Sequence, residues 1–204
     1  MGKVKAIIFD FDGVIHNTFD LAYGIHKKLN PGLSKEHFRS HFDGNLFKFI
    51  DKNPNKEPPG KFRELEHKAF KKLKLENKIR GILAELAKNY RLYIISSNSS
   101  NNLNMYFENN NFTNVFEEIL AVETHKSKSE KFKILFKKYN LTPNSCIFVT
   151  DTLGDILEAK KIGVKSIACT FGFHEKERLE KGKPYRIVSS FDEVVKTIKE
   201  IDSR

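Results

Sequence analysis

Long apolar runs and cysteines are scarce in this sequence. No stretch approaches the roughly 18 consecutive apolar residues that a membrane span needs, and no signal-peptide apolar region follows Met1. The two cysteines among the 204 residues, Cys146 and Cys169, fall inside or beside apolar strand patterns. Such positions favour small buried side chains over a disulfide or metal ligands. These absences predict a cytoplasmic protein with no membrane partner.

Acidic residues are outnumbered by basic ones, and the formal net charge is +10. The lysines are spread through helix-like stretches rather than gathered in one arm, and no aromatic-interleaved basic motif or zinc-finger spacing is present. We therefore expect a solvated lysine-rich surface, with nucleic acid an unlikely partner. The positive field would steer a small anionic substrate toward the protein.

Apolar runs alternate with helical patterns over most of the chain. The patterns predict strands at 4–9, 91–96, 118–122, 146–150, 165–169 and 186–188, and helices at 79–87, 99–109, 128–139 and 153–161. A last helix begins at Ser190, where Ser190 and Glu193 fit a capping box. Strands separated by helical crossovers predict an α/β fold, a Rossmann-like parallel sheet flanked by helices.

The segment between the first two strands is too long for a crossover. It carries four helical patterns, with Thr18 and Ser34 as N-caps of the first two, a third pattern at 45–51, a loop at 53–60 and a lysine-rich helix at 61–74. We expect a small α-helical cap, residues 16–78, inserted after the first strand. The core domain would then consist of residues 1–15 and 79–204.

Acidic residues follow two of the predicted strands. Asp10 and Asp12 end the first, and Asp151 and Asp155 follow the strand at 146–150. Ligands of open α/β sheets bind outside the carboxyl ends of the strands, so we expect these four side chains to converge there. Such a cluster repels itself unless a divalent cation neutralises it, and hard oxygen ligands favour Mg²⁺. The pattern therefore predicts a magnesium site.

The sequence Asp-Phe-Asp-Gly also resembles the start of a calcium-binding EF-hand loop. That interpretation fails, because Leu21 stands where the loop needs its glutamate ligand. Hydrolysis of a phosphomonoester fits the residues better. One carboxylate can attack to form an aspartyl-phosphate, a cation can screen the two anions, and an acid can protonate the leaving oxygen.

These motifs resemble those of the haloacid dehalogenase (HAD) superfamily of phosphatases, over nearly the whole chain. The first family motif, DxDG followed by a small or β-branched residue, matches Asp10-Phe11-Asp12-Gly13-Val14. The resemblance implies that Asp10 is the nucleophile and Asp12 the general acid/base. The second motif, a Ser or Thr ending a strand, matches Ser96, followed by Ser97 and Asn98. These residues would hold the phosphoryl group.

The third motif is a lysine at the start of a later helix, and here Lys126, Lys128 and Lys131 are all candidates. We choose Lys128, because Phe132 follows it at the spacing usual in the family. The fourth motif, an acidic pair after a strand, matches Asp151 and Asp155. The resemblance implies that Asp151 ligates Mg²⁺ directly, and that Asp155 either ligates through water or orients the lysine.

The inserted segment resembles the family's C1 helical cap, as in phosphoglycolate phosphatase and β-phosphoglucomutase relatives. Such a cap would close over the site and exclude water. Arg39, Asn45 and Lys48 are candidates for contacts with the leaving group, and an ordinary solvated helix face is the alternative for each. His16 either touches substrate near the cap hinge or is exposed there. The turn at 170–174 resembles an aromatic-glycine turn beside the family's site.

The resemblance implies a Mg²⁺-dependent phosphatase that acts on a small phosphorylated metabolite, phosphoglycolate-like by analogy, as a monomer or dimer. Three alternatives remain open at this stage. A phosphomutase uses the same motifs but returns the phosphoryl group to its substrate. A non-catalytic phosphate-binding module would keep the fold without turnover, and the charge of +10 raises a nucleic-acid end phosphatase.

Overall fold

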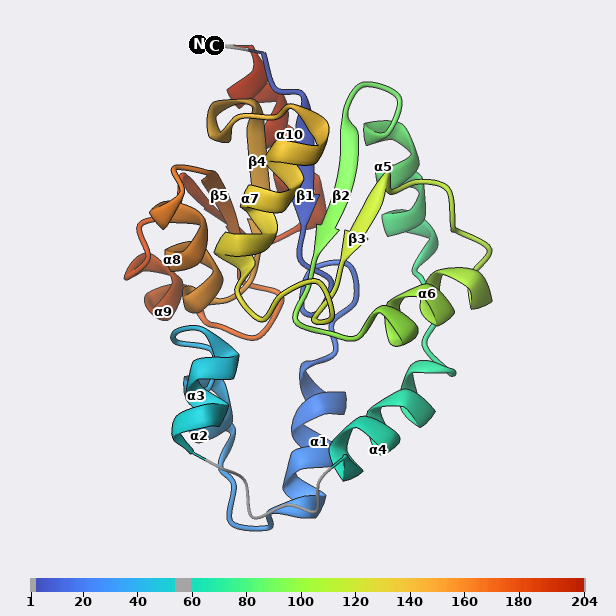
Figure 1. The fold of residues 1–204 in the computed structure, drawn as a ribbon, viewed down its shortest axis with the longest axis vertical. Helices are drawn as coiled ribbons and strands as arrows, with labels where there is room; N and C mark the ends of the chain where they lie inside the picture. The colour runs from blue at the N-terminus through green and yellow to red at the C-terminus, as the bar shows by residue number, and fades with distance from the viewer. Residues whose placement is uncertain (1–2, 54–59, 204) are drawn as a thin grey trace.

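One six-stranded sheet forms the centre of the molecule. The structure, a computed structural model, describes residues 3–53 and 60–203. All strand pairs are parallel, in the order β3-β2-β1-β4-β5-β6 (Figure 1). The strands are β1 (Ala6–Phe9), β2 (Arg91–Ile95), β3 (Glu118–Leu120), β4 (Cys146–Thr150), β5 (Lys165–Cys169) and β6 (Arg186–Val188). The predicted α/β fold is confirmed.

Helices cover both faces of this sheet. One core cluster joins the sheet to α5 (Asn77–Leu86), α6 (Ser100–Asn109) and α10 (Phe191–Asp202), and a second joins it to α7 (Lys128–Tyr139) and α8 (Leu153–Lys161). In β1, Ile7 and Phe9 belong to the first cluster, and Ala6 and Ile8 to the second. This alternation follows from the period of two in a strand, and burial on both faces explains the continuous apolar run.

Two details after β5 differ from the predictions. The short helix α9 (Lys176–Glu180) was not predicted; its Leu179 is fully buried against Ile156 and Ala168. The capping box is only half formed. The Ser190 side chain accepts a hydrogen bond from the Glu193 amide, but the Glu193 carboxylate accepts from Ser189 rather than from Ser190.

The inserted segment forms four helices, which Figure 1 shows together beyond the carboxyl ends of the strands. They are α1 (Phe19–Leu29), α2 (Lys35–Ser40), α3 (Leu46–Lys52) and α4 (Lys61–Phe70). Ser34 caps α2 as predicted, accepting from the His37 amide at 3.0 Å. The predicted loop at 53–60 falls mostly on residues 54–59, which lie outside the described residues.

Two predictions for this segment are wrong. Thr18 does not cap α1; its hydroxyl donates to the Asp12 carboxylate at 2.6 Å. Helix α4 ends at Phe70 rather than at residue 74, because Phe70 turns into the main core against the Phe11 ring and Leu75 donates its amide to the Asn110 side chain. The division into a core and a cap at residues 16–78 stays a prediction.

The α2–α3 turn rests on the core at the start of α8. The Gly154 amide donates to the Phe42 carbonyl at 2.9 Å, and Asn45 donates to the Glu158 carboxylate at 3.1 Å. The backbones approach so closely that a Cβ on Gly154 would lie 2.1 Å from the Gly44 carbonyl oxygen. Glycine is therefore required at 154. No helix within residues 3–53 and 60–203 is long and apolar enough to cross a membrane.

Substituting alanine for each of two helical glycines tests this contact. Gly154→Ala should lower the free energy of unfolding by about 1–3 kcal/mol, because the added methyl forces the turn away. Gly81→Ala is the matched control. Gly81 lies inside α5 with nothing within 4 Å of a built Cβ, so alanine should raise the free energy of unfolding by about 0.5–1 kcal/mol. Urea denaturation measures both, and a Gly154→Ala protein as stable as wild type would contradict the close packing.

Candidate active site

The predicted site residues meet at the carboxyl ends of the central strands, where the strand order reverses. Asp10 directly follows β1 and Asp151 follows β4, and these strands are neighbours with Phe9 beside Val149. Ser96 follows β2 on the other side of β1. In the strand order β3-β2-β1-β4, β1 has β2 on one side and β4 on the other. Such a reversal of strand order opens a crevice at the carboxyl ends of the strands. The sheet therefore places all three residues at one crevice.

Lys128, the first residue of α7, joins two of the carboxylates. Its ammonium donates to Asp10 at 2.6 Å and to Asp155 at 2.7 Å, and only 3% of its side chain is exposed. Burial alone would lower the pKa of Lys128, but the two carboxylates raise it above its usual value. The ammonium is therefore charged at neutral pH. Asp155 also accepts from the Thr150 hydroxyl at 2.9 Å, which fixes it against the lysine.

The other two candidate lysines lie elsewhere. The ammonium of Lys131 is buried and donates to the Ser96 carbonyl. Burial and the nearby Lys128 charge lower the pKa of Lys131 to about 7. Lys126 lies over the Phe47 ring, with its Nζ 5.8 Å from the ring centroid. Of the three candidate lysines, Lys128 is the one whose ammonium donates a hydrogen bond to Asp10.

Asp12 points into the crevice from the turn after β1. Its two oxygens accept from the Thr18 hydroxyl at 2.6 Å and the Asn98 amide group at 3.1 Å. Burial raises the pKa of Asp12 above its usual range, although both hydrogen bonds oppose the shift. The buried Ser96 hydroxyl accepts from the Asn98 backbone amide at 3.0 Å, and Ser97 lines the cavity described below. The structure thus brings Asp12, Ser96, Ser97 and Asn98 together, and the roles assigned to them stay predictions.

Asp151 is fully buried, and one of its oxygens has no partner within the described residues. Its Oδ2 accepts from the Phe173 amide at 2.7 Å, whereas its Oδ1 lacks a hydrogen bond. A Cβ on Gly13 or Gly172 would lie 1.7 or 2.2 Å from Oδ2, so both neighbours must be glycine. Gly13 also has a φ of 75°, which glycine adopts readily. Burial raises the pKa of Asp151 to about 8.

A buried carboxylate oxygen without a partner fits a hard divalent cation. Mg²⁺ typically keeps several waters and takes only one or two protein carboxylates, and the free oxygen of Asp151 fits one such ligand. The described residues contain no group of three or more His, Cys, Asp and Glu side chains arranged to hold a metal. The predicted set of Asp10, Asp12, Asp151 and Asp155 therefore stays a prediction. Within it, Asp155 accepts through Oδ2 from both Lys128 and Thr150.

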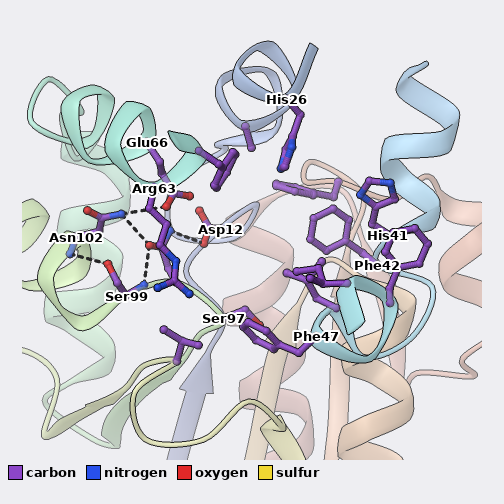
Figure 2. Close-up of a pocket in the computed structure, with 18 of the residues that line it drawn as sticks. Asp12, His26, His41, Phe42, Phe47, Arg63, Glu66, Ser97, Ser99 and Asn102 are labelled. Atoms are coloured by element: carbon purple, nitrogen blue, oxygen red, sulfur yellow. Dashed lines mark hydrogen bonds between the residues drawn. The ribbon is translucent and has the colours of Figure 1, made fainter. Parts of the chain in front are cut away.

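A cavity of about 630 Å³ extends from Asp10 and Asp12 under the inserted helices. Figure 2 shows two sides to it: Arg63, Glu66, Ser99 and Asn102 lie on one side of Asp12, and His26, His41, Phe42 and Phe47 lie on the other. Apart from Asp12, none of these residues was predicted from the sequence. A signal existed for part of the first group, since Arg63, Glu66 and His67 recur at the spacing of one helix face.

Glu66 faces the site from α4. Its carboxylate accepts from the Asn102 side chain at 3.2 Å. Burial, followed by the nearby Asp12 charge, raises the pKa of Glu66 to about 8. Glu66 is therefore largely protonated at neutral pH, and this state lets a second carboxyl group approach Asp12 without repulsion.

Two of the three candidates for leaving-group contacts, Arg39 and Asn45, bond the inserted helices to the core. Arg39 donates to the Phe173 carbonyl at 2.8 Å, and Asn45 caps α3 and bonds the core. His16 is half-buried, with its Nδ1 3.1 Å from the Tyr106 hydroxyl. Neither these three nor Lys48 line the cavity as the structure describes it. The turn at 170–174 lies beside the site as expected, through the Phe173 contact with Asp151.

The molecule combines a parallel sheet, a cluster of carboxylates with a buried lysine at the carboxyl ends of its strands, and an inserted helical segment over them. This combination indicates an α/β enzyme. Comparison with known families agrees. Residues 7–169 match the haloacid dehalogenase-like hydrolase family, and the chain belongs to that family. The prediction of a HAD-type phosphatase is thereby confirmed at the level of enzyme class.

Individual relatives are distant, and two of the three described here extend over nearly the whole chain. A phosphoglycolate phosphatase of Synechococcus elongatus is 21% identical over 97% of this chain and 99% of its own length. A phosphoglycolate phosphatase of Colwellia psychrerythraea is 24% identical over 58% of this chain and 54% of its own length. A haloacid dehalogenase-like family protein from Streptococcus pneumoniae superposes with a TM-score of 0.78 at 23% identity, covering 97% of this chain and 99% of that one.

The raised pKa of Glu66 predicts how stability depends on pH. Its folded-state pKa of about 8 exceeds the ordinary value of 4.5, so the folded protein binds this proton more tightly than the unfolded chain. The contribution is fully present below about pH 4.5 and is lost as the pH rises through 8. Glu66→Gln, which cannot ionise, should therefore lose less stability between pH 5 and pH 8 than wild type, as measured by urea midpoints. Equal losses in both proteins would show that Glu66 ionises normally.

Proposed function

We propose that this hydrolase is a Mg²⁺-dependent phosphatase that cleaves a small phosphomonoester through an aspartyl-phosphate on Asp10. The observation that carries the proposal is the buried Lys128 ammonium, held between Asp155 and Asp10, the carboxylate that lines the cavity. A fixed positive charge beside a buried carboxylate favours the approach of a phosphate dianion to that carboxylate. Surface lysines do not supply such a charge, because water screens them.

Asp10 has the orientation that a nucleophile requires. One oxygen accepts from the Phe11 amide at 2.7 Å and the other from Lys128, so the carboxylate cannot rotate away from the cavity. Burial raises the pKa of Asp10 well above its usual value, and Lys128 opposes that shift. In the proposed first step, an Asp10 oxygen attacks phosphorus and the bond to the alcohol oxygen breaks. Water then cleaves the aspartyl-phosphate and releases inorganic phosphate.

Asp12 is suited to donate the proton that the leaving alcohol needs. Its raised pKa keeps a proton available closer to neutral pH than an exposed aspartate would. Thr18 and Asn98 hold its two oxygens, so the carboxyl group has one orientation toward the cavity. After the alcohol leaves, the same group would accept a proton from the attacking water. Ser96, Ser97 and Asn98 would hold the phosphoryl oxygens.

Asp10 and Asp151 would hold the Mg²⁺ ion, with the unpartnered Asp151 Oδ1 as the clearest ligand. When bound, the cation neutralises charge on the phosphoryl oxygens and the carboxylates. The loop after β5 supports this role, because the Phe173 amide leaves only the second oxygen of Asp151 free. The Gly13 and Gly172 backbones close around the carboxylate and fix it in place.

The names of the curated relatives make phosphoglycolate the first substrate to test. A small phosphorylated metabolite fits a cavity that lies beneath the inserted helices, whereas a nucleic-acid end would have to enter past them. A phosphomutase would use the same residues, and only the fate of the phosphoryl group separates the two. The cytoplasmic location and the monomeric or dimeric state stay predictions.

Removing the nucleophile tests the mechanism. Asp10→Asn should reduce phosphate release by about 10³-fold or more, because an amide cannot form the acyl phosphate. The fold should persist, since burial already disfavours the charge at this position. Asp192→Asn, which changes an exposed carboxylate in α10, is the control and should leave turnover unchanged. Substantial activity in Asp10→Asn with a native circular dichroism spectrum would rule out the mechanism.

Metal removal and product analysis test the cofactor and the reaction type. Excess chelator should reduce turnover by about 100-fold or more, and added Mg²⁺ should restore it. Inorganic phosphate should appear in step with loss of the ester, without an isomeric phosphate ester among the products. Accumulation of such an isomer would support the phosphomutase instead, and turnover that survives chelation would exclude the metal.

A further inference from the structure

The cavity has two arms, which differ in chemistry. The polar arm is lined by residues of α4 and α6, among them Arg63, Glu66 and Asn102. The aromatic arm lies under α1, α2 and α3, and Figure 2 shows His26, His41, Phe42 and Phe47 there. Asp12 lies between the two arms (Figure 2). A leaving group that departs from a phosphoryl group on Asp10 can therefore enter either arm.

In the polar arm, the side chain of Asn102 already has hydrogen-bond partners. The Asn102 side chain donates to the Glu66 carboxylate at 3.2 Å and to the Asn98 side-chain oxygen Oδ1 at 3.0 Å. The remaining oxygen of Asn102 lies 2.8 Å from His67 Nδ1. A hydroxyl or carboxylate of a substrate would have to displace these partners and leave buried groups unpaired, which is costly. A polar leaving group in this arm would therefore compete with the hydrogen bonds that Asn102 already makes.

The aromatic arm offers flat apolar surfaces instead. Six phenylalanines line the cavity: Phe38, Phe42, Phe47, Phe49, Phe62 and Phe173. Two of them stack on histidines, Phe62 on His26 and Phe49 on His41, each with ring centroids 4.2 Å apart and interplanar angles of 20° and 26°. Aromatic faces and edges at such spacings favour a planar ring as a further neighbour.

The size of the cavity points to the same kind of occupant. Its volume of about 630 Å³ lies within the roughly 300–1,000 Å³ typical of cavities that bury drug-sized ligands. A group as small as glycolate would fill a minor part of it and would leave the phenylalanines facing water. An apolar group in the aromatic arm would remove that surface from water and contribute to binding.

We propose that the aromatic arm binds the leaving group of the substrate, and that this group is an apolar planar ring carried by a primary phosphomonoester. The proposal rests on the proposed phosphatase function and adds the substrate class to it. The phosphoryl group would lie at Asp10 and Lys128. The ring would lie among the phenylalanines of the inserted helices, so that these helices select the substrate.

Binding and turnover of matched compounds test the proposal together. Dissociation constants of 2-phenylethylphosphonate and ethylphosphonate, which cannot be hydrolysed, report the aromatic arm alone. Values of kcat/KM for 2-phenylethyl phosphate, ethyl phosphate and phosphoglycolate report the arm during catalysis. Burial of a phenyl ring should favour the phenylethyl compounds by about 10- to 100-fold in both measurements.

The outcomes separate this proposal from the phosphatase function. Hydrolysis of all three esters with phosphoglycolate preferred, or with no preference, would overturn the aromatic-arm proposal and leave the phosphatase standing. Tighter binding of 2-phenylethylphosphonate without hydrolysis of any ester would overturn the phosphatase and support the arm. Equal binding of the two phosphonates would overturn the proposal whatever the turnover.

A charge placed in the arm provides a second test. Ile50 lines the cavity and is 38% exposed, while Ile134 on α7 is 40% exposed and does not line the described cavity. Glutamate is therefore tolerated sterically at both positions. Ile50→Glu should reduce the preference for 2-phenylethylphosphonate over ethylphosphonate by about fivefold or more, whereas Ile134→Glu should leave it unchanged. An unchanged preference in Ile50→Glu would overturn the assignment of the ring to this arm.

Discussion

The ion pairs of Lys128 with Asp10 and Asp155 are the interaction on which the site depends. Three buried ionisable groups at one crevice are stable only when opposite charges lie within hydrogen-bond distance, because burial penalises each charge. The pairs join the end of β1, the start of α7 and the start of α8. They thereby fix the relative positions of three segments that lie far apart in the sequence, and they keep a positive charge beside Asp10, which lines the cavity.

Asp151 is also a buried carboxylate, but no ion pair at hydrogen-bond distance within the described part of the chain compensates its burial. It has no basic partner at hydrogen-bond distance among the described residues; it has one backbone donor, two glycines at close range and one unpartnered oxygen. Protonation or a cation must compensate its burial. Asp155, which pairs with Lys128, and Asp151, which has one oxygen without a partner among the described residues, both follow β4. One short segment therefore provides both a counterion for the lysine and a candidate metal ligand.

The inserted helices supply most of the aromatic lining of the cavity, together with Arg63 and Glu66 from α4. Arg39 and Asn45 attach the α2–α3 region to the core through hydrogen bonds. The same region presents Phe42 and Phe47 to the cavity. The aromatic side of the cavity therefore depends on packing within the inserted segment and on how that segment rests on α8.

The sequence by itself determined the fold class and the residues of the core site. Buried parallel strands produce continuous apolar runs, and residues at their carboxyl ends must meet at one edge, so Asp10, Ser96 and Asp151 could be placed together from spacing. Family spacing favoured Lys128, but only the tertiary structure places its ammonium on Asp10 and the ammonium of Lys131 on the Ser96 carbonyl. The tertiary structure also decided that Thr18 bonds Asp12, that Arg39 holds the inserted segment, and that Glu66 and the phenylalanines line the cavity. Those contacts depend on how the insertion packs against the core, and no short-range pattern in the sequence records that packing.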